Sequence, residues 1–525
     1  MLVAHDATWL ARARVSPRLR SPAFAPTLVA AAGALAFLIV QPPVGDLWAA
    51  RARQSAAAHG VGLTYWFSWF GGGSTPGHYS VVTPYLSALV GAATIGAIAT
   101  AAITPLCWRL VQGSKHPLAA TWTVTLTAGF SLWSGRIPFA LGTAVSVAVF
   151  IAVRNGWTWR AAVGALVGVL SSPVSGVFIA FGLLGTLVVS RPHRRISATT
   201  IVAVGVGLAV VAATYGSPGP QGFPAGQAVI TTVALFLLLV ARPPRFLTVV
   251  VLLAIIAVPL LVAIPNGMGS NFERMTWICL PVAVVATAGI RLPVAVGAAA
   301  VAVISGARGT VADIQVAARP TSSASYYSSL AHELDRVTNL SNYRVEVVAD
   351  GTHTAAYALL EHAALARGYE TQADNAFNRV LMSWTDLTPV SYKVWLDNNS
   401  VGYVALPTTV VRANPEYSLV STAMLPYLTT IWSNPDWVLM RVRQPNPIVA
   451  PPATVFDADQ AVLELAVPRP GPVHIRVRWS AFLSVDGPDG APAAQLANDG
   501  SGWTVLTVAV PGRYKLSGSA TGLTR

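Results

Sequence analysis

The sequence predicts a polytopic α-helical membrane protein of about 11 spans, joined to an exported part that holds an α/β unit and a small β-sandwich. Three observations predict this fold class. Apolar residues make up 54% of the 525 residues and charged residues only 10%, whereas a soluble domain is about 25% charged. Long apolar runs fill residues 1–310, and the charge balance changes near residue 310. This composition excludes an ordinary soluble enzyme, a disordered chain, a collagen and a coiled coil.

The net charge of +13 is distributed unevenly along the chain. Residues 1–310 hold 19 Lys and Arg but only three acids, and residues 311–525 hold 15 basic and 18 acidic residues. A uniformly basic chain would indicate nucleic-acid binding. The division instead indicates a membrane part with positive loops and a mildly acidic exported part, so we expect no nucleic-acid partner.

Apolar runs of about 20 residues predict membrane-spanning helices, because that length crosses the ~30 Å hydrocarbon core at 1.5 Å per residue. The run 161–189 is too long for one span and is split at Ser171-Ser-Pro173, since proline disfavours a continuous helix. The expected spans are 25–40, 79–103, 118–134, 137–153, 161–171, 174–189, 197–215, 225–241, 246–264, 276–290 and 292–306.

Basic residues predict how these spans are oriented, because cytoplasmic loops carry an excess of Lys and Arg. With the split, every later basic cluster falls on the same side as the head of the chain. We therefore expect a plasma-membrane protein with a cytoplasmic N-terminus and, with an odd number of spans, an extracytoplasmic C-terminal half. The clusters are Arg12/Arg14/Arg18/Arg20, Arg109/Lys115, Arg154/Arg160, Arg191/Arg194/Arg195, Arg242/Arg245 and Arg291.

Three domains follow from the composition: a transmembrane domain at 1–310, an α/β domain at 311–445 and a β-sandwich at 453–525. Alternating helix and strand patterns predict the α/β domain, and short strands separated by turn residues predict the sandwich. The expected helices are 324–338, 354–366, 388–398 and 417–430, and the expected strands are 343–348, 401–406, 437–442, 461–467, 473–479 and 503–509.

Ionisable residues beside membrane segments are costly and are therefore functional candidates. Orientation explains the cytoplasmic arginines but not the residues placed on the outer side. Asp46 is the catalytic candidate, because it is the only acid between Asp6 and Glu273 and lies in the long outer loop 41–78. The substrate-binding candidates from the outer loops are Arg51, Arg53, His78, Tyr79, Arg136, Asn271, Glu273 and Arg274.

The first outer loop combines several features. Leu47–Ala58 reads as an interfacial amphipathic helix, and Tyr65–Phe70 is an aromatic run suited to the membrane interface. A carboxylate here can act as general base or help hold a divalent cation, and Arg51 and Arg53 can bind a phosphate.

Plainer roles stay open for each of these residues. Asp46 could cap the helix that follows it, His78 could be an ordinary interfacial histidine, and Arg136 could pair with Glu273-Arg274 structurally. The two cysteines, Cys107 and Cys279, indicate no disulfide framework. No cluster has metal-ligand spacing, so the cofactor is undefined and no metal ligands are assigned.

The first loop resembles that of polyprenyl-phosphate-dependent membrane glycosyltransferases of the C-type superfamily (GT-C). The shared features are Asp46, the helix, the aromatic run, Gly-Gly and Pro76-Gly-His-Tyr79. More closely, the chain is similar to actinobacterial integral membrane proteins described as "6-pyruvoyl-tetrahydropterin synthase-related". The further matching stretches are Ser171–Gly176, Asn271–Arg274, His353–Tyr357, Leu365–Glu370, Leu387–Pro389, Trp395–Asn399 and Tyr403–Pro407.

The resemblance implies transfer of a sugar from a polyprenyl-phosphate donor to a hydroxyl of an envelope glycan or glycolipid on the outer face. It implies that Asp46 is the base or a metal ligand and that Arg136 or Arg274 holds the donor phosphate. Many members have two adjacent acids in this loop, whereas Asp46 stands alone between Gly45 and Leu47, which argues against a metal site. Pterin chemistry is not expected, because the sequence supplies no histidine triad for zinc.

Two other classes of function stay open. A transporter or flippase of envelope lipids or glycans fits the many spans and the broken helix, although the acids avoid the span centres. A non-catalytic envelope scaffold fits the exported domains. The protein partners are undefined by the sequence, and membrane lipid is expected around residues 1–310.

Overall fold

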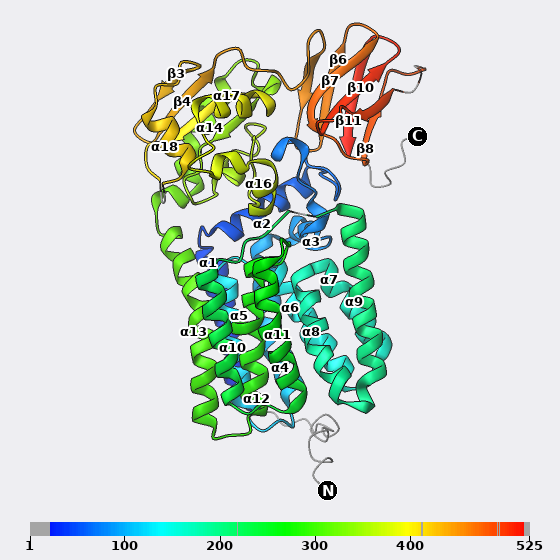
Figure 1. Cartoon of the computed structure of the whole chain (residues 1–525), viewed down its shortest axis with the longest axis vertical. Helices are drawn as coiled ribbons and strands as arrows, with labels where there is room; N and C mark the ends of the chain where they lie inside the picture. The colour runs from blue at the N-terminus through cyan, green and yellow to red at the C-terminus, as the bar shows by residue number, and fades with distance from the viewer. Residues whose placement is uncertain (1–20, 218, 411–412, 491, 493, 519–525) are drawn as a thin grey trace. The chain divides into compact units, whose positions relative to one another are not determined.

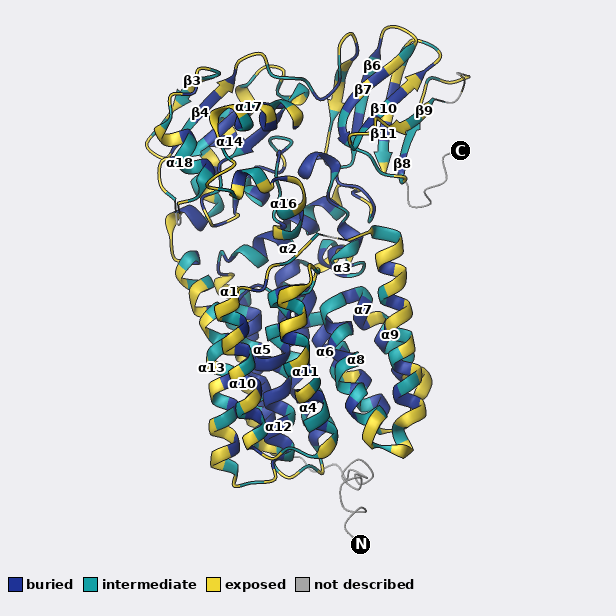
Figure 2. Ribbon diagram, viewed as in Figure 1, coloured by how far each residue is buried: buried dark blue, intermediate teal, exposed yellow. Residues whose placement is uncertain are grey.

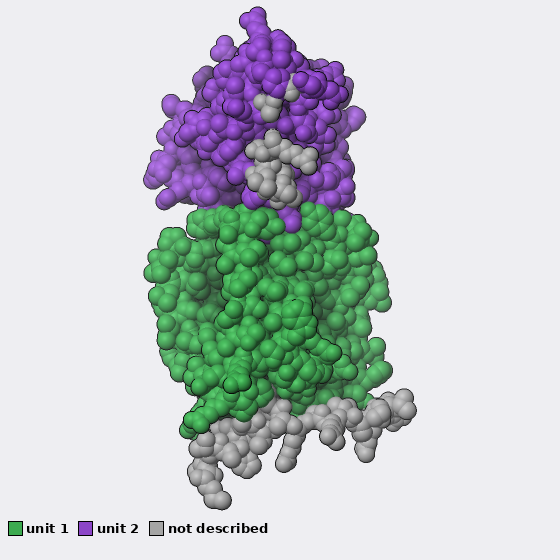
Figure 3. Space-filling model, turned by 90° about the vertical axis from the view of Figure 1, so that its right-hand side faces the viewer, with its two compact units in different colours: residues 1–42, 79–315 green, residues 43–78, 316–525 purple. Residues whose placement is uncertain are grey.

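A computed structural model describes residues 21–217, 219–410, 413–490, 492 and 494–518. The chain divides into two compact units (Figure 3). Unit 1 is residues 1–42 and 79–315, and unit 2 is residues 43–78 and 316–525. The basic head with Arg12, Arg14, Arg18 and Arg20, and also Asp6, lies outside the described residues.

Unit 1 is a bundle of apolar helices (Figure 1). Five helical segments are long and apolar enough to cross a bilayer, namely α4, α6, residues 191–215 with α9, α11 and α13, which indicates a membrane protein. A sixth would count only if α1 and α2 were one bent span. The helices are α1 (Phe24–Val40), α3 (Thr83–Val90), α4 (Ala92–Val111), α5 (Pro117–Trp133), α6 (Ile137–Arg154), α7 (Thr158–Ser171), α8 (Pro173–Val189), α9 (Arg194–Tyr215), α10 (Ala225–Val240), α11 (Arg245–Ala263), α12 (Leu280–Thr287) and α13 (Leu292–Ala317).

The helix breaks of unit 1 follow proline and glycine. The expected split of 161–189 is confirmed: α7 ends at Ser171, Ser172 is extended and α8 begins at Pro173. The expected continuous span 79–103 is wrong, because Gly91 has φ 90° and separates α3 from α4. Glycine adopts a positive φ without a steric penalty because it has no Cβ, whereas other residues rarely adopt it. The predicted domain boundary at 310 falls inside α13.

Exposed residues recur along the helices of unit 1 (Figure 2), and many of them are large and apolar. They recur every four residues, which puts them on one helix face. Large contiguous apolar surface is rare on soluble monomers, so these faces fit a lipid environment. Examples are Val202, Val206 and Val210 on α9, and Leu252, Ile256 and Leu260 on α11.

The α/β part of unit 2 has one four-stranded sheet in the order β1-β2-β4-β3. β1 and β2 are parallel, and β4 is antiparallel to both β2 and β3. Apolar clusters lie on both faces of the sheet. The elements are α14 (Ser328–Arg336), β1 (Arg344–Val347), α15 (Ala355–Ala358), α16 (Thr371–Phe377), α17 (Pro389–Asn398), β2 (Val401–Pro407), α18 (Pro415–Thr422), β3 (Leu428–Ser433) and β4 (Trp437–Val442).

Two predicted helices of this part are wrong. Residues 354–366 form only the short α15 and then pair with β1, where Val345 N–H donates to Ala364 and Ala366 N–H donates to Val345. The predicted helix 417–430 ends at Thr422, before Pro426, and β3 follows. In the first case long-range strand pairing overrides a local helical pattern, and in the second proline prevents the helix from continuing.

The C-terminal part of unit 2 holds two antiparallel sheets, β7-β10-β9 and β5-β6-β11-β8. Alternate residues of β6, β7, β10 and β11 supply one shared apolar core. The three predicted strands are present, and the sequence reading missed the other four. The strands are β5 (Thr454–Ala458), β6 (Val462–Val467), β7 (Gly471–Arg478), β8 (Leu483–Asp486), β9 (Gln495–Asn498), β10 (Trp503–Val508) and β11 (Gly512–Gly518).

The long loop 41–78 belongs to unit 2 from residue 43 onward and includes α2 (Gly45–Ala58). Its aromatic residues are not an interfacial belt: Trp66, Phe67 and Trp69 are 0% exposed. Trp66 and Trp69 stack at 3.8 Å between ring centroids and pack with Leu360. The run is buried because residues more than 250 positions further along the chain provide the apolar partners.

Candidate functional site

Asp46 lies in the first turn of α2, where the positive end of the helix dipole favours a carboxylate. It does not cap the helix, because the N-cap residue is Val44. The Tyr369 hydroxyl donates to Asp46 Oδ1 at 3.1 Å. This approach requires Gly45, since a Cβ there would lie 2.9 Å from the Tyr369 hydroxyl oxygen. The catalytic candidate is therefore held by a distant residue of unit 2.

Tyr369 also contacts His353. The two rings meet edge to face with centroids 4.5 Å apart, and Asp46 lies within electrostatic range of the imidazole. His353 is exposed and has φ 60°. A non-glycine residue in this left-handed region carries strain of about 1–3 kcal/mol, which is often found at functional sites.

A small cavity of about 60 Å³ lies beyond the end of β1 and is lined by His353, Asp350, Arg367 and Asp374. The carboxyl ends of parallel strands are the usual ligand position in α/β sheets. The Asp350 carboxylate accepts from the Tyr327 hydroxyl at 2.9 Å and from the Thr352 backbone N–H at 2.7 Å. The cavity thus presents carboxylates and an imidazole of fixed position, which can accept hydrogen bonds from hydroxyl groups.

Arg367, a lining residue of this cavity, is fixed by two buried carboxyl groups. It donates to Glu346, and its Nη2 lies 2.7 Å from Glu416 Oε2. Burial raises the pKa of Glu346 well above its ordinary value, the neighbouring Glu416 raises it further, and Arg367 opposes both effects. Burial likewise raises the pKa of Glu416. Arg367 is consequently a structural cation of the site.

Two candidates from the first loop are held by Glu370. Arg53 Nη2 lies 2.5 Å from Glu370 Oε1 and His78 Nε2 lies 3.7 Å from Glu370 Oε2, and all three side chains are at most 6% exposed. Burial lowers the pKa of His78, while Glu370 partly offsets the effect. Arg53 therefore pairs with a protein carboxylate within unit 2, and His78 lies beside the same carboxylate without a hydrogen bond to it. Arg51 lies over the Trp48 ring at 4.7 Å.

Three candidates of unit 1 come together. Arg136 occupies the N-cap position of α6 without a side-chain capping bond, and its Nη2 lies 3.8 Å from Asp313 Oδ2. Glu273 accepts from Gln227 Nε2 at 2.5 Å and lies within electrostatic range of Arg136 and Arg274. Burial raises the pKa of Glu273, and these three neighbours lower it.

The other candidates of unit 1 have the following positions. Arg274 lies over the Phe139 ring at 5.3 Å, Asn271 sits in the 3-10 turn Gly269–Phe272, and Tyr79 is half-buried in unit 1. Charged residues from separate segments of unit 1 thus form one cluster. The sequence reading missed Asp313 and Gln227, because helical positions carry no local sign of a distant partner.

The candidate residues therefore form two groups. Unit 2 holds Asp46, Arg51, Arg53 and His78, and unit 1 holds the rest. The sequence reading also missed Tyr369, His353 and Asp374, although the first two lie in the stretches that carry the family resemblance. Among the described residues no group of three or more His, Cys, Asp or Glu is arranged to hold a metal ion.

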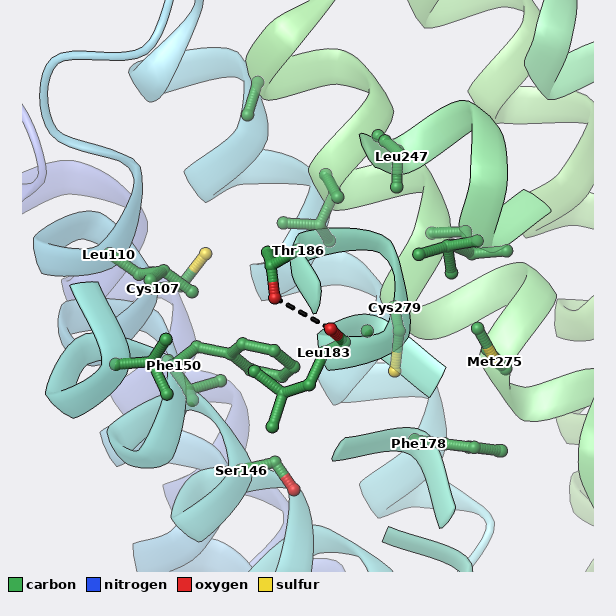
Figure 4. Close-up of a pocket in the computed structure, with 18 of the residues that line it drawn as sticks. Cys107, Leu110, Ser146, Phe150, Phe178, Leu183, Thr186, Leu247, Met275 and Cys279 are labelled. Atoms are coloured by element: carbon green, nitrogen blue, oxygen red, sulfur yellow. Dashed lines mark hydrogen bonds between the residues drawn. The ribbon is translucent and has the colours of Figure 1, made fainter. Parts of the chain in front are cut away.

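A second cavity, of about 230 Å³, lies inside unit 1 (Figure 4). Its wall is largely apolar and comes from α4, α5, α6, α8, α11 and α12 together with residues 275–279. Phe150, Phe178 and Leu183 line it, and Arg154 and His193 are its basic residues.

Comparison with known proteins covers the end of the chain. Residues 450–523 match the model of a family described as a domain of unknown function (DUF8823). The match coincides with the two-sheet C-terminal part of unit 2. No curated protein matches the sequence.

Proposed function

We propose that the protein is a membrane glycosyltransferase that transfers a sugar from a lipid-phosphate donor to a hydroxyl of an envelope glycan or glycolipid. In this proposal the chain is GT-C-like, spans the plasma membrane 11 times with its N-terminus in the cytoplasm, and acts on the outer face. The observation that carries the proposal is the position of Asp46, held by Tyr369 beside His353 in unit 2.

The chemistry assigns a role to each group. The Asp46 carboxylate accepts the proton of the acceptor hydroxyl as its oxygen attacks the anomeric carbon. The bond from that carbon to the phosphate oxygen breaks, and the lipid phosphate leaves with its electron pair. Hydroxyls of the acceptor donate to carboxylates of the polar cavity. The family resemblance assigns the donor phosphate to Arg136 or Arg274, whose guanidinium groups suit a phosphate.

A transporter or flippase is the second candidate, because α7 and α8 form a broken helix pair and residues 275–279 form a π-helix. Such breaks are common in transporters and at functional sites. Counterflow of a lipid-linked sugar in proteoliposomes, undiminished in Asp46→Asn, would favour it over transfer.

The test of the glycosyltransferase function removes the carboxylate base at Asp46 and keeps a side chain of nearly the same shape. A deletion strain is complemented with Asp46→Asn, Arg274→Ala or the exposed-site control Asp335→Asn, and the envelope glycans are profiled by mass spectrometry. We expect Asp46→Asn to lower the product by about 10²–10⁴-fold, the contribution of a general base, with Arg274→Ala also impaired and the control unaffected. Normal glycans in Asp46→Asn, at equal protein level and beside a defect in the deletion strain, would falsify the proposal.

A further inference from the structure

We propose that the cavity of unit 1 binds one acyl chain of a membrane phospholipid, with the phosphate held at the end where Arg154 and His193 lie. The proposal does not depend on the transferase function, because it concerns a different site. Four properties of the cavity support it: its wall, its volume, its depth and the charge of its lining.

The wall of the cavity is largely apolar, and most of its hydroxyl residues are satisfied within their own helices, Ser175 being an exception. Thr143 donates to the Phe139 carbonyl at 2.7 Å and Ser146 to the Gly142 carbonyl at 2.7 Å. Thr186 donates to the Leu183 carbonyl at 2.8 Å (Figure 4). These hydroxyls are satisfied by their own helices and offer little to water. An apolar cavity of this kind stays dry and takes up apolar molecules.

The volume and depth of the cavity select the kind of molecule. Its 230 Å³ exceeds the ~150 Å³ of an engineered cavity that binds benzene. Along α8 the lining runs from Ser175 to Thr186, which is about 16 Å at 1.5 Å per residue. That is about half of the ~30 Å hydrocarbon core, or the depth of one leaflet. An acyl chain has this reach, whereas a long polyprenyl chain does not fit within it.

The polar lining identifies the headgroup. Arg154 Nη1 donates to the backbone carbonyls of Arg109 and Leu110 at 2.9 and 2.6 Å, which fixes the guanidinium in place. His193 Nδ1 lies 3.0 Å from Ser190 Oγ. Among the described lining residues there is no acid. Burial lowers the pKa of His193, so the Arg154 guanidinium supplies the positive charge and the imidazole supplies a polar group. A cation without a lining carboxylate suits an anionic phosphate.

The experiment measures lipid that stays with the purified full chain. Native mass spectrometry in mild detergent compares the unmodified protein with Ala283→Phe and Ser146→Leu, which fill the cavity, and with Val206→Phe on the exposed face of α9. We expect one retained phospholipid per chain in the unmodified protein and in Val206→Phe, and about tenfold less in either filled variant, a 1.4 kcal/mol effect. Two separate cavity-filling variants are used in case one of them misfolds. Size-exclusion chromatography detects such misfolding.

A second arm tests the headgroup. The delipidated protein is titrated with phosphatidylglycerol and with diacylglycerol of the same chains, and we expect the phosphate-bearing lipid to bind at least about tenfold more tightly. His193→Gln should reduce the difference in affinity between the two lipids without breaking the carbonyl contacts of Arg154. Full retention of lipid in both filled variants, an isoprenyl phosphate as the sole bound species, or equal binding of the two lipids would overturn the proposal.

Discussion

The two units satisfy buried polar groups in different ways. In unit 1 many buried hydroxyls return to their own helices, as Thr143, Ser146 and Thr200 do by donating to carbonyls four residues earlier. In unit 2 several buried polar groups are charged and pair across long stretches of sequence, as Arg53 does with Glu370. A membrane supplies no water to satisfy polar groups, so many hydroxyls of unit 1 use partners in their own helices, whereas unit 2 assembles ions from separate segments. The cluster of Arg136, Glu273 and Arg274 is a charged exception in unit 1.

This difference shows which polar contacts constrain distant segments of the chain. A local hydroxyl bond places no constraint on distant residues, whereas an ion assembled from separate segments fixes those segments against one another. The Asp46–Tyr369 contact belongs to the second kind. We therefore expect substitutions in unit 2 to be costly and the matching substitutions in unit 1 to be mild.

The largest effect is expected at Arg367. Replacing it in Arg367→Met leaves Glu346 and Glu416 buried without a cation, and breaking a buried pair costs about 3–5 kcal/mol. Urea titration of the purified chain, with proteolysis to follow fragments of unit 2, measures the free energy of unfolding. The control Arg336→Met removes a side chain that is 69% exposed and should change stability by less than about 0.5 kcal/mol. Equal urea unfolding midpoints for Arg367→Met and Arg336→Met would show that the ion network does not contribute to the stability of unit 2.

A matched threonine pair gives the next effect. Thr352 Oγ1 donates to both carboxylate oxygens of Asp350 at 2.8 Å in unit 2, and Thr200 Oγ1 donates to the Ile196 carbonyl at 2.7 Å in unit 1. Both residues are buried. We expect Thr352→Val to cost about 1.5–3 kcal/mol, as for a hydrogen bond to a charged group, and Thr200→Val about 0.6 kcal/mol, the mean for membrane helices. Thermal unfolding of each variant compares them, and a larger loss in Thr200→Val would reverse the comparison.

The same contrast explains what the sequence could predict. The break at Pro173, the β strands 461–467 and 503–509 and the apolar helices depend on local residues, and each was predicted. The partners of Asp46 and Arg53 lie more than 300 positions away, and no local pattern signals such a contact. The aromatic run was misread for this reason, because the same residues suit a membrane interface and the core of a folded unit.

The smallest effect is expected from His78, and it depends on pH. Burial lowers the pKa of His78 in the folded protein, so the unfolded chain binds more protons than the folded chain just below pH 6.5. Stability is therefore full above the unfolded pKa of about 6.5 and falls as the pH drops through the window toward the lower folded value. Glu370 and Arg53 face the ring and act in opposite directions on it.

His78→Gln removes this titration while keeping a polar side chain beside Glu370. We expect the melting temperature of unit 2 to drop less between pH 7.5 and 5.5 in His78→Gln than in the unmodified chain, whereas His362→Gln, at the exposed pair with Asp335, leaves that drop nearly unchanged. Identical pH profiles for His78→Gln and the unmodified chain would mean that the imidazole is not buried in unit 2. The loop 41–78 would then belong at a membrane surface, as its sequence alone indicates, and the contrast between the two units would lose its clearest example.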